Sequence, residues 1–416
     1  MIKDVPDGWR VEKISDTVFF QEGPGVRKTQ FTEKGIKLLN GGNINNNKIN
    51  LDTTKIYISE DEAYGKYKHF LIEDGDLLIA CSGITVKTFH KKIAFITKKD
   101  LPLCLNTSTM RFRTLNNERL DINFFKFFLM TNMFRNQLQR HITGSAQLNF
   151  GPSHIKKMFI PIPPLPQQEK IVKVLDISSE LIEKQKELIE NYDLFLKSKF
   201  IEMFGDPIQN PMGWGVKKLK DISTLISSGS TPKGGREVYV KEGILFFRSQ
   251  NVWKNKMLLD DIAYIDEETH LKMKKSSLKH KDILMTKTGR FNTENSSLGR
   301  AALFLGEDDS ANVNGHVYLI RLKEDMIPEY VVYILTTTEY RDYIGRVCVG
   351  GIDKRQINKT HLEQFPIIFP PIEQQEKFAS IVEKINTIKA KETQKLEHLE
   401  ILHNSLMDKA FKGEIQ

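Results

Sequence analysis

Two stretches of the chain carry apolar residues at heptad spacing, and this pattern predicts two long helices. The first begins near Gln167 and has two adjacent apolar columns: Val174, Leu181, Leu188 and Phe195, then, one position on, Leu175, Ile182, Ile189, Leu196 and Met203. A third column at the same spacing is mixed in character: Ile171, Ser178, Gln185 and Tyr192. The second stretch has similar spacing: Ile381, Ile385, Ile388, Leu396, Leu399, Leu402 and Leu406. A stripe this wide needs a partner helix, so we predict that the two helices pack antiparallel, each a rod of roughly 50 Å.

Outside these stretches, short apolar runs alternate with turn residues, which predicts mixed α/β structure. Three runs bounded by Gly, Asn and Asp are expected to be strands: residues 55–58, 76–80 and 92–96. Residues 122–138 are expected to form one helix with four apolar side chains near one face: Phe124, Phe128, Phe134 and Leu138. A proline-rich segment, residues 159–166, predicts an extended lead-in to the first long helix.

The chain repeats itself at an offset of 205 to 208 residues, in four separated blocks that keep their order. The pairs are PDGWRVEKI (6–14) with PMGWGVKKL (211–219), GIKLL (35–39) with GILFF (243–247), GDLLI (75–79) with KDILM (281–285), and PPLPQQEKI (163–171) with PPIEQQEKF (370–378). We therefore predict a tandem duplication, with an α+β fold in which two mixed α/β domains are separated by two long antiparallel, coiled-coil-like helices about a pseudo-twofold axis. The expected boundaries are 1–160, 161–206, 207–367 and 368–416.

The length of 416 residues suits two or more cores, and the net charge of +8 suits a polyanionic partner. The positive charge is uneven along the chain. Residues 167–204 hold six Lys and Arg against eight Asp and Glu, and residues 374–413 hold seven against six, so the excess lies in the globular parts. No apolar run approaches the ~20 residues that span a bilayer, and the start of the chain is unlike a signal peptide, so we expect a cytoplasmic protein without a membrane partner.

Motifs for catalysis are weak. FQEGPG (20–25) only faintly resembles a glycine-rich turn for S-adenosylmethionine, because no convincing buried strand precedes it and no Asn-Pro-Pro-Tyr or Asp-Pro-Pro-Tyr segment accompanies it. SGSTPKGG (228–235) does not match the phosphate-binding pattern of nucleotide hydrolases. The ten histidines form neither H-x-x-x-H nor H-E-x-x-H, so no zinc site is expected. We predict no catalytic residues, no metal and no cofactor bound by this chain.

The sequence resembles the specificity (S) subunits of type I restriction-modification enzymes over essentially its whole length. The residues that carry the resemblance are the paired Gly-Trp dipeptides, the Gly-Asp-Leu-Leu and Lys-Asp-Ile-Leu segments, GSAQ (144–147), FGDP (204–207) and the two Pro-Pro-x-x-Gln-Gln-Glu-Lys junctions. The second domain departs from the pattern at GGID (350–353), where Ser-Ala-Gln is missing.

This resemblance implies two target recognition domains, each of which reads one half of a split double-stranded DNA sequence. The helical regions would set the spacer between the halves. It also implies two methylase (M) subunits and the restriction (R) subunits as partners. S-adenosylmethionine, ATP and Mg²⁺ would then be bound by those partners.

Turns that follow the matched segments are the expected places for DNA contacts, because Arg, Lys, Asn and Gln read base edges and Ser or Lys contact phosphates. In the first domain the candidates are Asn40, Asn43, Ser82, Lys87, Ser145 and Gln147. In the second domain they are Arg248, Gln250, Asn251, Lys287, Arg290, Asn292, Lys354 and Arg355.

Two other functions stay open at this point. A self-contained DNA methyltransferase or nuclease with a divergent catalytic domain would bind S-adenosylmethionine or cleave DNA without partners. A scaffold that only joins other proteins through its helices would lack the salt-sensitive DNA binding expected of the specificity subunit.

Overall fold

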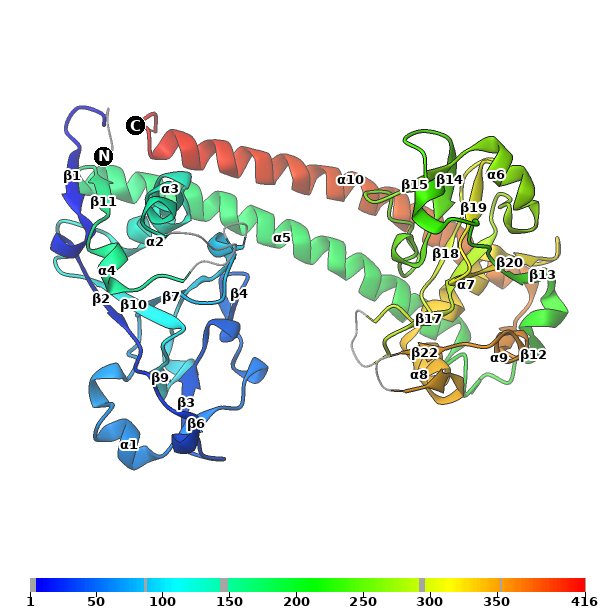
Figure 1. Cartoon of the computed structure of the whole chain (residues 1–416), viewed down its shortest axis with the longest axis horizontal. Coiled ribbons are helices and arrows are strands. Elements are labelled where there is room, and N and C mark those ends of the chain that lie inside the picture. The colour runs from blue at the N-terminus through cyan, green and yellow to red at the C-terminus, as the bar shows by residue number, and fades with distance from the viewer. Residues whose placement is uncertain (1–4, 86–87, 143–148, 292–295, 352–353, 416) are drawn as a thin grey trace. The chain divides into compact units, whose positions relative to one another are not determined.

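The computed structural model describes residues 5–85, 88–142, 149–291, 296–351 and 354–415. The chain divides into two compact units (Figure 1). Unit 1 contains Met1–Lys186 and Gln394–Gln416, and unit 2 contains Glu187–Thr393. Each unit has its own sheets, its own short helices and its own core, so the predicted fold class, a duplicated α+β protein, is confirmed.

Unit 1 is built on a four-stranded sheet and a three-stranded sheet. The first has the order β2 (Val18–Glu22), β10 (Thr109–Thr114), β7 (Leu77–Ala80) and β8 (Ile93–Phe95), with antiparallel neighbours. The second has the order β6 (Tyr57–Ile58), β3 (Ile36–Leu39) and β9 (Leu103–Leu105), and β3 runs parallel to β9. A separate pair joins β1 (Arg10–Lys13) to β11 (Phe159–Ile162). All three predicted strands are present, as β6, β7 and β8.

Unit 2 repeats these three sheets in the same strand order. Its four-stranded sheet has the order β13 (Ser223–Ser228), β20 (Val317–Leu322), β16 (Ile283–Thr286) and β18 (Ala301–Leu303). Its three-stranded sheet has the order β15 (Ala263–Ile265), β14 (Ile244–Phe247) and β19 (Ala311–Val313), again with one parallel pair, and β12 (Gly215–Lys218) joins β23 (Pro366–Phe369). A further small sheet has the order β17 (Thr288–Gly289), β22 (Arg355–Gln356) and β21 (Val349–Gly350). The duplication inferred from four short blocks therefore extends to the strand order of the three sheets that the units share.

The prediction of one helix over residues 122–138 is wrong, because this segment forms α2 (Ile122–Met130) and α3 (Asn132–His141). Thr131 between them has an extended backbone, and its Oγ1 accepts a hydrogen bond from Phe134 N at 3.1 Å, which caps α3. The four apolar residues expected on one face are all buried. Unit 2 has the same break at Thr337, between α7 (Pro328–Thr336) and α8 (Thr338–Val347). The remaining short helices are α1 (Glu60–Tyr64), α4 (Pro152–Ile155), α6 (Glu267–Lys272) and α9 (Lys359–Glu363).

The two predicted long helices are α5 (Leu165–Phe204) and α10 (Ile372–Ala410), and each contributes residues to both units. Their starts are fixed by the second glutamine of each Gln-Gln-Glu junction. Gln168 is fully buried; its Nε2 donates to Pro163 O at 2.9 Å, and its Oε1 accepts from Asp121 N at 2.8 Å. Gln375 is also buried and donates in the same way to Pro370 O at 2.9 Å. In each repeat, the motif therefore forms a hydrogen bond between the proline turn and the first turn of a long helix.

The helices pair antiparallel within each unit. In unit 1, Ser178 Oγ lies 2.8 Å from His403 Nδ1, and Lys186 Nζ lies 3.3 Å from Glu400 Oε1. In unit 2, Asp193 forms an ion pair with Lys389 near one end of the paired stretch. Further along, the rings of Phe200 and Phe378 are 5.4 Å apart. Residue numbers rise along α5 as they fall along α10.

One predicted column of the helix stripe faces outward, which corrects the expected seam. Leu181, Leu188 and Phe195 are 48%, 39% and 48% exposed, whereas the mixed column supplies buried Ile171 and Ser178. The buried and half-buried positions alternate at spacings of four and three: 171, 175, 178, 182, 185, 189, 192 and 196. The heptad period identifies a stripe, but with three adjacent columns it does not identify which two meet the partner helix.

The ends of the long helices complete the two cores. Phe411, just beyond α10, lies 5.0 Å from the ring of Phe124 in unit 1. In unit 2, Phe204 at the end of α5 packs against Tyr330 and Phe378, with ring centroids 5.0 and 5.5 Å away. Burial of one such aromatic side chain contributes roughly 1.5–3 kcal/mol. No helix within the described ranges is both long and apolar enough to cross a membrane.

Candidate nucleic-acid interface

Five polar segments meet at one end of the unit 1 sheets. They are residues 22–25, 40–43, 81–83, 106–108 and 149–151. Hydrogen bonds join the last four: Asn106 Nδ2 to Asn40 Oδ1 (2.7 Å), Gly41 N to Ser108 Oγ (3.0 Å), Cys81 N to Ser108 O (2.9 Å) and Gly83 N to Asn149 Oδ1 (3.0 Å). Gly23 permits the close approach, since a Cβ there would lie 2.4 Å from the backbone of Asn106. We call these five segments loop cluster 1.

The same arrangement occurs in unit 2, as loop cluster 2. Its segments are residues 228–231, 248–251, 287–290, 314–316 and 354–357. Hydrogen bonds join them to one another, from Lys287 N to His316 O (2.8 Å) and Ile357 N to Lys287 O (2.9 Å), and to the ends of the adjoining strands, from Asn314 N to Phe247 O (2.9 Å) and Ser230 N to Val313 O (3.0 Å). Gly229 takes the place of Gly23, with a Cβ position 2.1 Å from Val313 O. The glycine segments weighed as cofactor loops are therefore close-packed turns in both units.

The sequence did not point to the central segments of these clusters, 106–108 and 314–316. Each joins the strand that pairs in parallel with β3 or β14 to the next antiparallel strand. A run of Asn, Thr and Ser between two apolar strands at 106–109 was the available signal. Only the parallel strand pairing places that run beside Asn40.

Among the candidates in the first domain, Asn43 differs from the others because it is fully buried. Asn40 is half-buried, and its Nδ2 donates to Leu38 O at 3.0 Å. Ser82 is exposed, and its Oγ donates to Asn149 Oδ1 at 2.9 Å. Lys87, Ser145 and Gln147 lie outside the described residues. In this conformation Ser82 is open to solvent, whereas Asn43 is not available to a base.

In the second domain, Arg248 and Gln250 share one carboxylate. Arg248 Nη2 lies 3.0 Å from Asp261 Oδ1, and Gln250 Nε2 donates to Asp261 Oδ2 at 3.0 Å. The side chain of Arg248 is only 12% exposed, and Asn251 is buried, so Gln250 is the solvent-facing member of this group. Asn292 lies outside the described residues.

The other four candidates of the second domain are brought together by a strand pair. β17 pairs with β22 so that Gly289 faces Arg355, which places Lys287 and Arg290 beside Lys354 and Arg355. Arg290 and Lys354 are exposed. Arg355 is half-buried and donates from Nη1 to Gly345 O at 3.0 Å, so part of its guanidinium is used inside the unit.

Cationic side chains lie behind loop cluster 1. Lys92 Nζ donates to Asn45 Oδ1 at 2.5 Å and to Gly41 O at 3.4 Å, and burial lowers the pKa of this ammonium. Burial, followed by the charges of Arg135 and Lys91, lowers the pKa of the His90 imidazole. Lys92, together with the Lys91 and Arg135 charges that act on His90, places positive charge beside the polar turns, which suits a phosphate backbone.

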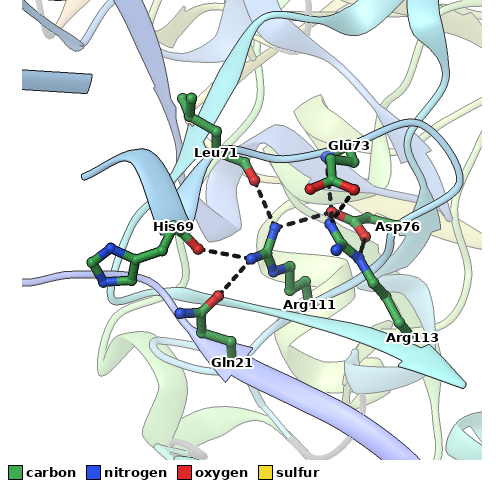
Figure 2. A network of polar contacts seen from close by, with 7 residues as sticks. All are labelled: Gln21, His69, Leu71, Glu73, Asp76, Arg111 and Arg113. Carbon is green, nitrogen blue, oxygen red and sulfur yellow. Dashed lines mark hydrogen bonds and ion pairs between the residues drawn. The ribbon is translucent and has the colours of Figure 1, made fainter. Parts of the chain in front are cut away.

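The Gly-Asp-Leu-Leu motif is structural. Figure 2 shows Asp76, buried at the start of β7, between Arg111 and Arg113 of β10. Arg113 Nη2 lies 3.0 Å from Asp76 Oδ2, while Arg111 donates to Leu71 O (2.6 Å), His69 O (2.8 Å) and Gln21 Oε1 (2.7 Å). In unit 2 the equivalent Asp282 binds Arg321 through both oxygens, at 2.9 and 2.7 Å. Each motif ties a turn to the central strand of its sheet.

The fold and the paired loop clusters define an internally duplicated α+β protein with equivalent polar surfaces in its two units. The family model described as "Type I restriction modification DNA specificity domain" matches residues 6–191 and 211–400. The chain therefore belongs to this family and contains its domain twice, as the resemblance implied.

Two relatives and one solved structure are similar to the chain. The type I restriction enzyme MjaIX specificity subunit from Methanocaldococcus jannaschii is 24% identical over 438 residues, which cover 100% of this chain and 95% of the relative. The MjaVIII specificity subunit from the same organism is 28% identical over 192 residues, which cover 45% of this chain but only 44% of that relative. The crystal structure of the type I restriction-modification S subunit from M. genitalium matches with a TM-score of 0.53 and 15% identity, over 99% of this chain and 97% of that one, which shows a shared fold.

Proposed function

We propose that this chain is the specificity subunit of a type I restriction-modification enzyme, and that loop clusters 1 and 2 each read one half of a bipartite double-stranded DNA target. The observation that carries this proposal is that equivalent loop positions hold different side chains, such as Asn40 in unit 1 and Arg248 in unit 2. Asparagine suits adenine and arginine suits guanine in the major groove, so the two halves of the target should differ.

We further propose that methylase subunits dock on the outward faces of α5 and α10, and that they, with restriction subunits, supply all catalysis together with S-adenosylmethionine, ATP and Mg²⁺. Exposed apolar side chains on these helices support this proposal. In unit 1 they include Ile177 and Leu181, and in unit 2 they include Leu188, Leu194 and Phe195. Exposed apolar patches of this kind are typical of protein-protein contacts.

The test is to express the chain with its methylase partner and to map methylated adenines in the DNA of those cells. We expect one split motif with two unlike halves. Methylation without a split motif, or S-adenosylmethionine binding by the isolated chain, would contradict the proposal and favour a self-contained methyltransferase.

Base reading can be tested at Arg248 and Arg290. We expect Arg248→Ala and Arg290→Ala to weaken binding to the cognate site more than binding to random DNA, by about 1–3 kcal/mol each. Lys354→Ala is the matched comparison, because loss of a phosphate contact lowers both affinities alike. The measurement is equilibrium binding of both DNAs at several salt concentrations, and equal losses on both DNAs for the arginine variants would count against base reading.

A further inference from the structure

A buried asparagine occupies the same place in the two loop clusters. Asn43 Oδ1 accepts from Asn40 N at 2.9 Å, and its Nδ2 donates to Asn50 O at 2.9 Å. Asn251 Oδ1 accepts from Arg248 N at 2.9 Å, and its Nδ2 donates to Leu258 O at 3.0 Å. The residues that these bonds join are related by the same offset of 208 positions. The side chains are 0% and 1% exposed, so the bonds are shielded from water.

Each asparagine closes the base of a short hairpin. In unit 1 the hairpin is β4 (Ile44–Asn45) and β5 (Lys48–Ile49), and the backbone of Asn43 also pairs with Asn50 at 2.8 Å. In unit 2, Val252 bridges Met257, and the backbone of Asn251 pairs with Leu258 at 2.8 Å. The two hairpins turn through residues with positive φ, which are Asn46 and Asn47 in unit 1 and Asn255 in unit 2.

The hairpins carry polar and cationic tips directly after the candidate base-reading positions. Asn46 and Lys48 are exposed in unit 1, where Lys48 Nζ lies 3.1 Å from Glu183 Oε2, and Asn255 and Lys256 are exposed in unit 2. Each tip is also hydrogen-bonded to a neighbouring segment of its unit. Asn47 N donates to Lys91 O at 3.1 Å, and Asn255 N donates to Ala301 O at 2.8 Å. Short ribbons with such side chains contact nucleic acid in other folds.

We propose that Asn43 and Asn251 are positioning residues for DNA selectivity, which hold residue 40 or 248 and the following hairpin in place while the neighbouring side chains determine the base. This inference rests on the function proposed above. The two units share the bond to the backbone N–H of residue 40 or 248 and the bond to the carbonyl of residue 50 or 258, although the residues so presented differ, as they must if the two halves of the target are unlike. Neither asparagine contacts DNA on this view.

Asparagine suits the task because one amide both accepts from a backbone N–H and donates to backbone carbonyl oxygens. An aspartate at the same place keeps the acceptor but places a second oxygen against Asn50 O or Leu258 O, and that carbonyl loses the amide donor. Alanine removes both interactions. The two substitutions therefore loosen the hairpin base by different routes.

The experiment uses the full chain expressed with its methylase partner and compares the methylated motif of the wild type with that of Asn43→Asp, Asn43→Ala, Asn251→Asp and Asn251→Ala. Thermal unfolding of each purified chain is measured alongside. The matched controls are Asp121→Ala and Asp266→Ala, which remove the caps of α2 and α6 in the same two units but lie outside the loop clusters. These controls lower stability without touching a hairpin.

We expect the Asn43 variants to relax base preference about tenfold in one half of the motif and to leave the other half intact, with the Asn251 variants doing the reverse. The controls should keep both halves. Folded asparagine variants with an unchanged motif, relaxation of both halves by one variant, or equal relaxation by the controls would overturn the positioning role. A wild-type chain without a split motif would instead contradict the proposed function, so the two failures are distinguishable.

Discussion

At the scale of single residues, the aspartate of the repeated motif has different arginine partners in the two units. Asp76 is buried between two guanidiniums, and Arg111 is itself only 6% exposed. Asp282 has one arginine partner, Arg321, whose side chain is 27% exposed. The strand that pairs with the motif-bearing strand explains the difference, because Leu319 occupies the position in β20 that Arg111 occupies in β10.

This difference predicts unequal costs for equivalent substitutions. Asp76→Asn leaves the buried charge of Arg111 without its counterion, and we expect a loss of about 3–5 kcal/mol in the free energy of unfolding. Asp282→Asn should cost clearly less, because water reaches Arg321. Urea unfolding of the two variants is the measurement, and equal losses would show that Arg111 is compensated by its three carbonyl and amide partners alone.

At the scale of elements, the long helices place a polar pair inside a mainly apolar seam and leave other apolar residues exposed outside it. Ser178 and His403 meet at 2.8 Å within the seam, and burial, followed by the charge of Lys126, lowers the pKa of the His403 imidazole. The outward Leu181 and Phe195 contribute little to the fold itself. Binding of a partner protein explains these exposed apolar residues better than a contribution to the stability of the fold does.

Two adjacent residues on α5 distinguish stability of the helix pair from docking of the methylase subunit. We expect Ile182→Ala to lower the free energy of unfolding by about 2–4 kcal/mol, because Ile182 is 7% exposed in the seam. Leu181→Ala should change it by no more than about 0.5 kcal/mol but should weaken assembly with the methylase subunit. The measurements are thermal unfolding and co-purification with that subunit. Normal assembly of Leu181→Ala combined with Phe195→Ala would argue against docking on this face.

At the scale of the whole molecule, α5 runs without interruption from one unit into the other. If the helices set the spacer between the half-sites, its length should follow their length. Deletions must keep the alternation of four and three residues in the seam, so whole heptads are the natural unit.

We expect deletion of residues 186–192 from α5 together with 390–396 from α10 to shorten the preferred spacer by about 3 base pairs, from ~1.5 Å of rise per residue against ~3.4 Å per base pair. The methylated motif of the deletion variant gives the new spacer directly. A single deletion in α5 is the control, since it breaks the pairing and should abolish methylation. An unchanged spacer in the double deletion would refute the helices as a ruler.

The sequence by itself determined the duplication, the two long helices, three strands of the first unit and the family, because these depend on local periodicity and on motifs that repeat at one offset. It also placed Arg248 and Gln250 in a turn, whereas Lys287 and Arg290, expected in another turn, flank the short strand β17. Local patterns sufficed there, since a strand end or a helix start is set by neighbouring residues.

Only the tertiary structure decided which of the candidate residues are exposed and so available to contact DNA. Asn43 and Asn251 share the turn chemistry of exposed candidates, yet long-range pairing buries them, and the parallel β3–β9 pair brings residues 106–108 beside Asn40. The seam of α5 was likewise determined by α10, which packs against the column that contains Ser178 and leaves the column of Leu181 exposed. In each case burial depends on a partner far away in the chain, and a local pattern carries no information about that partner.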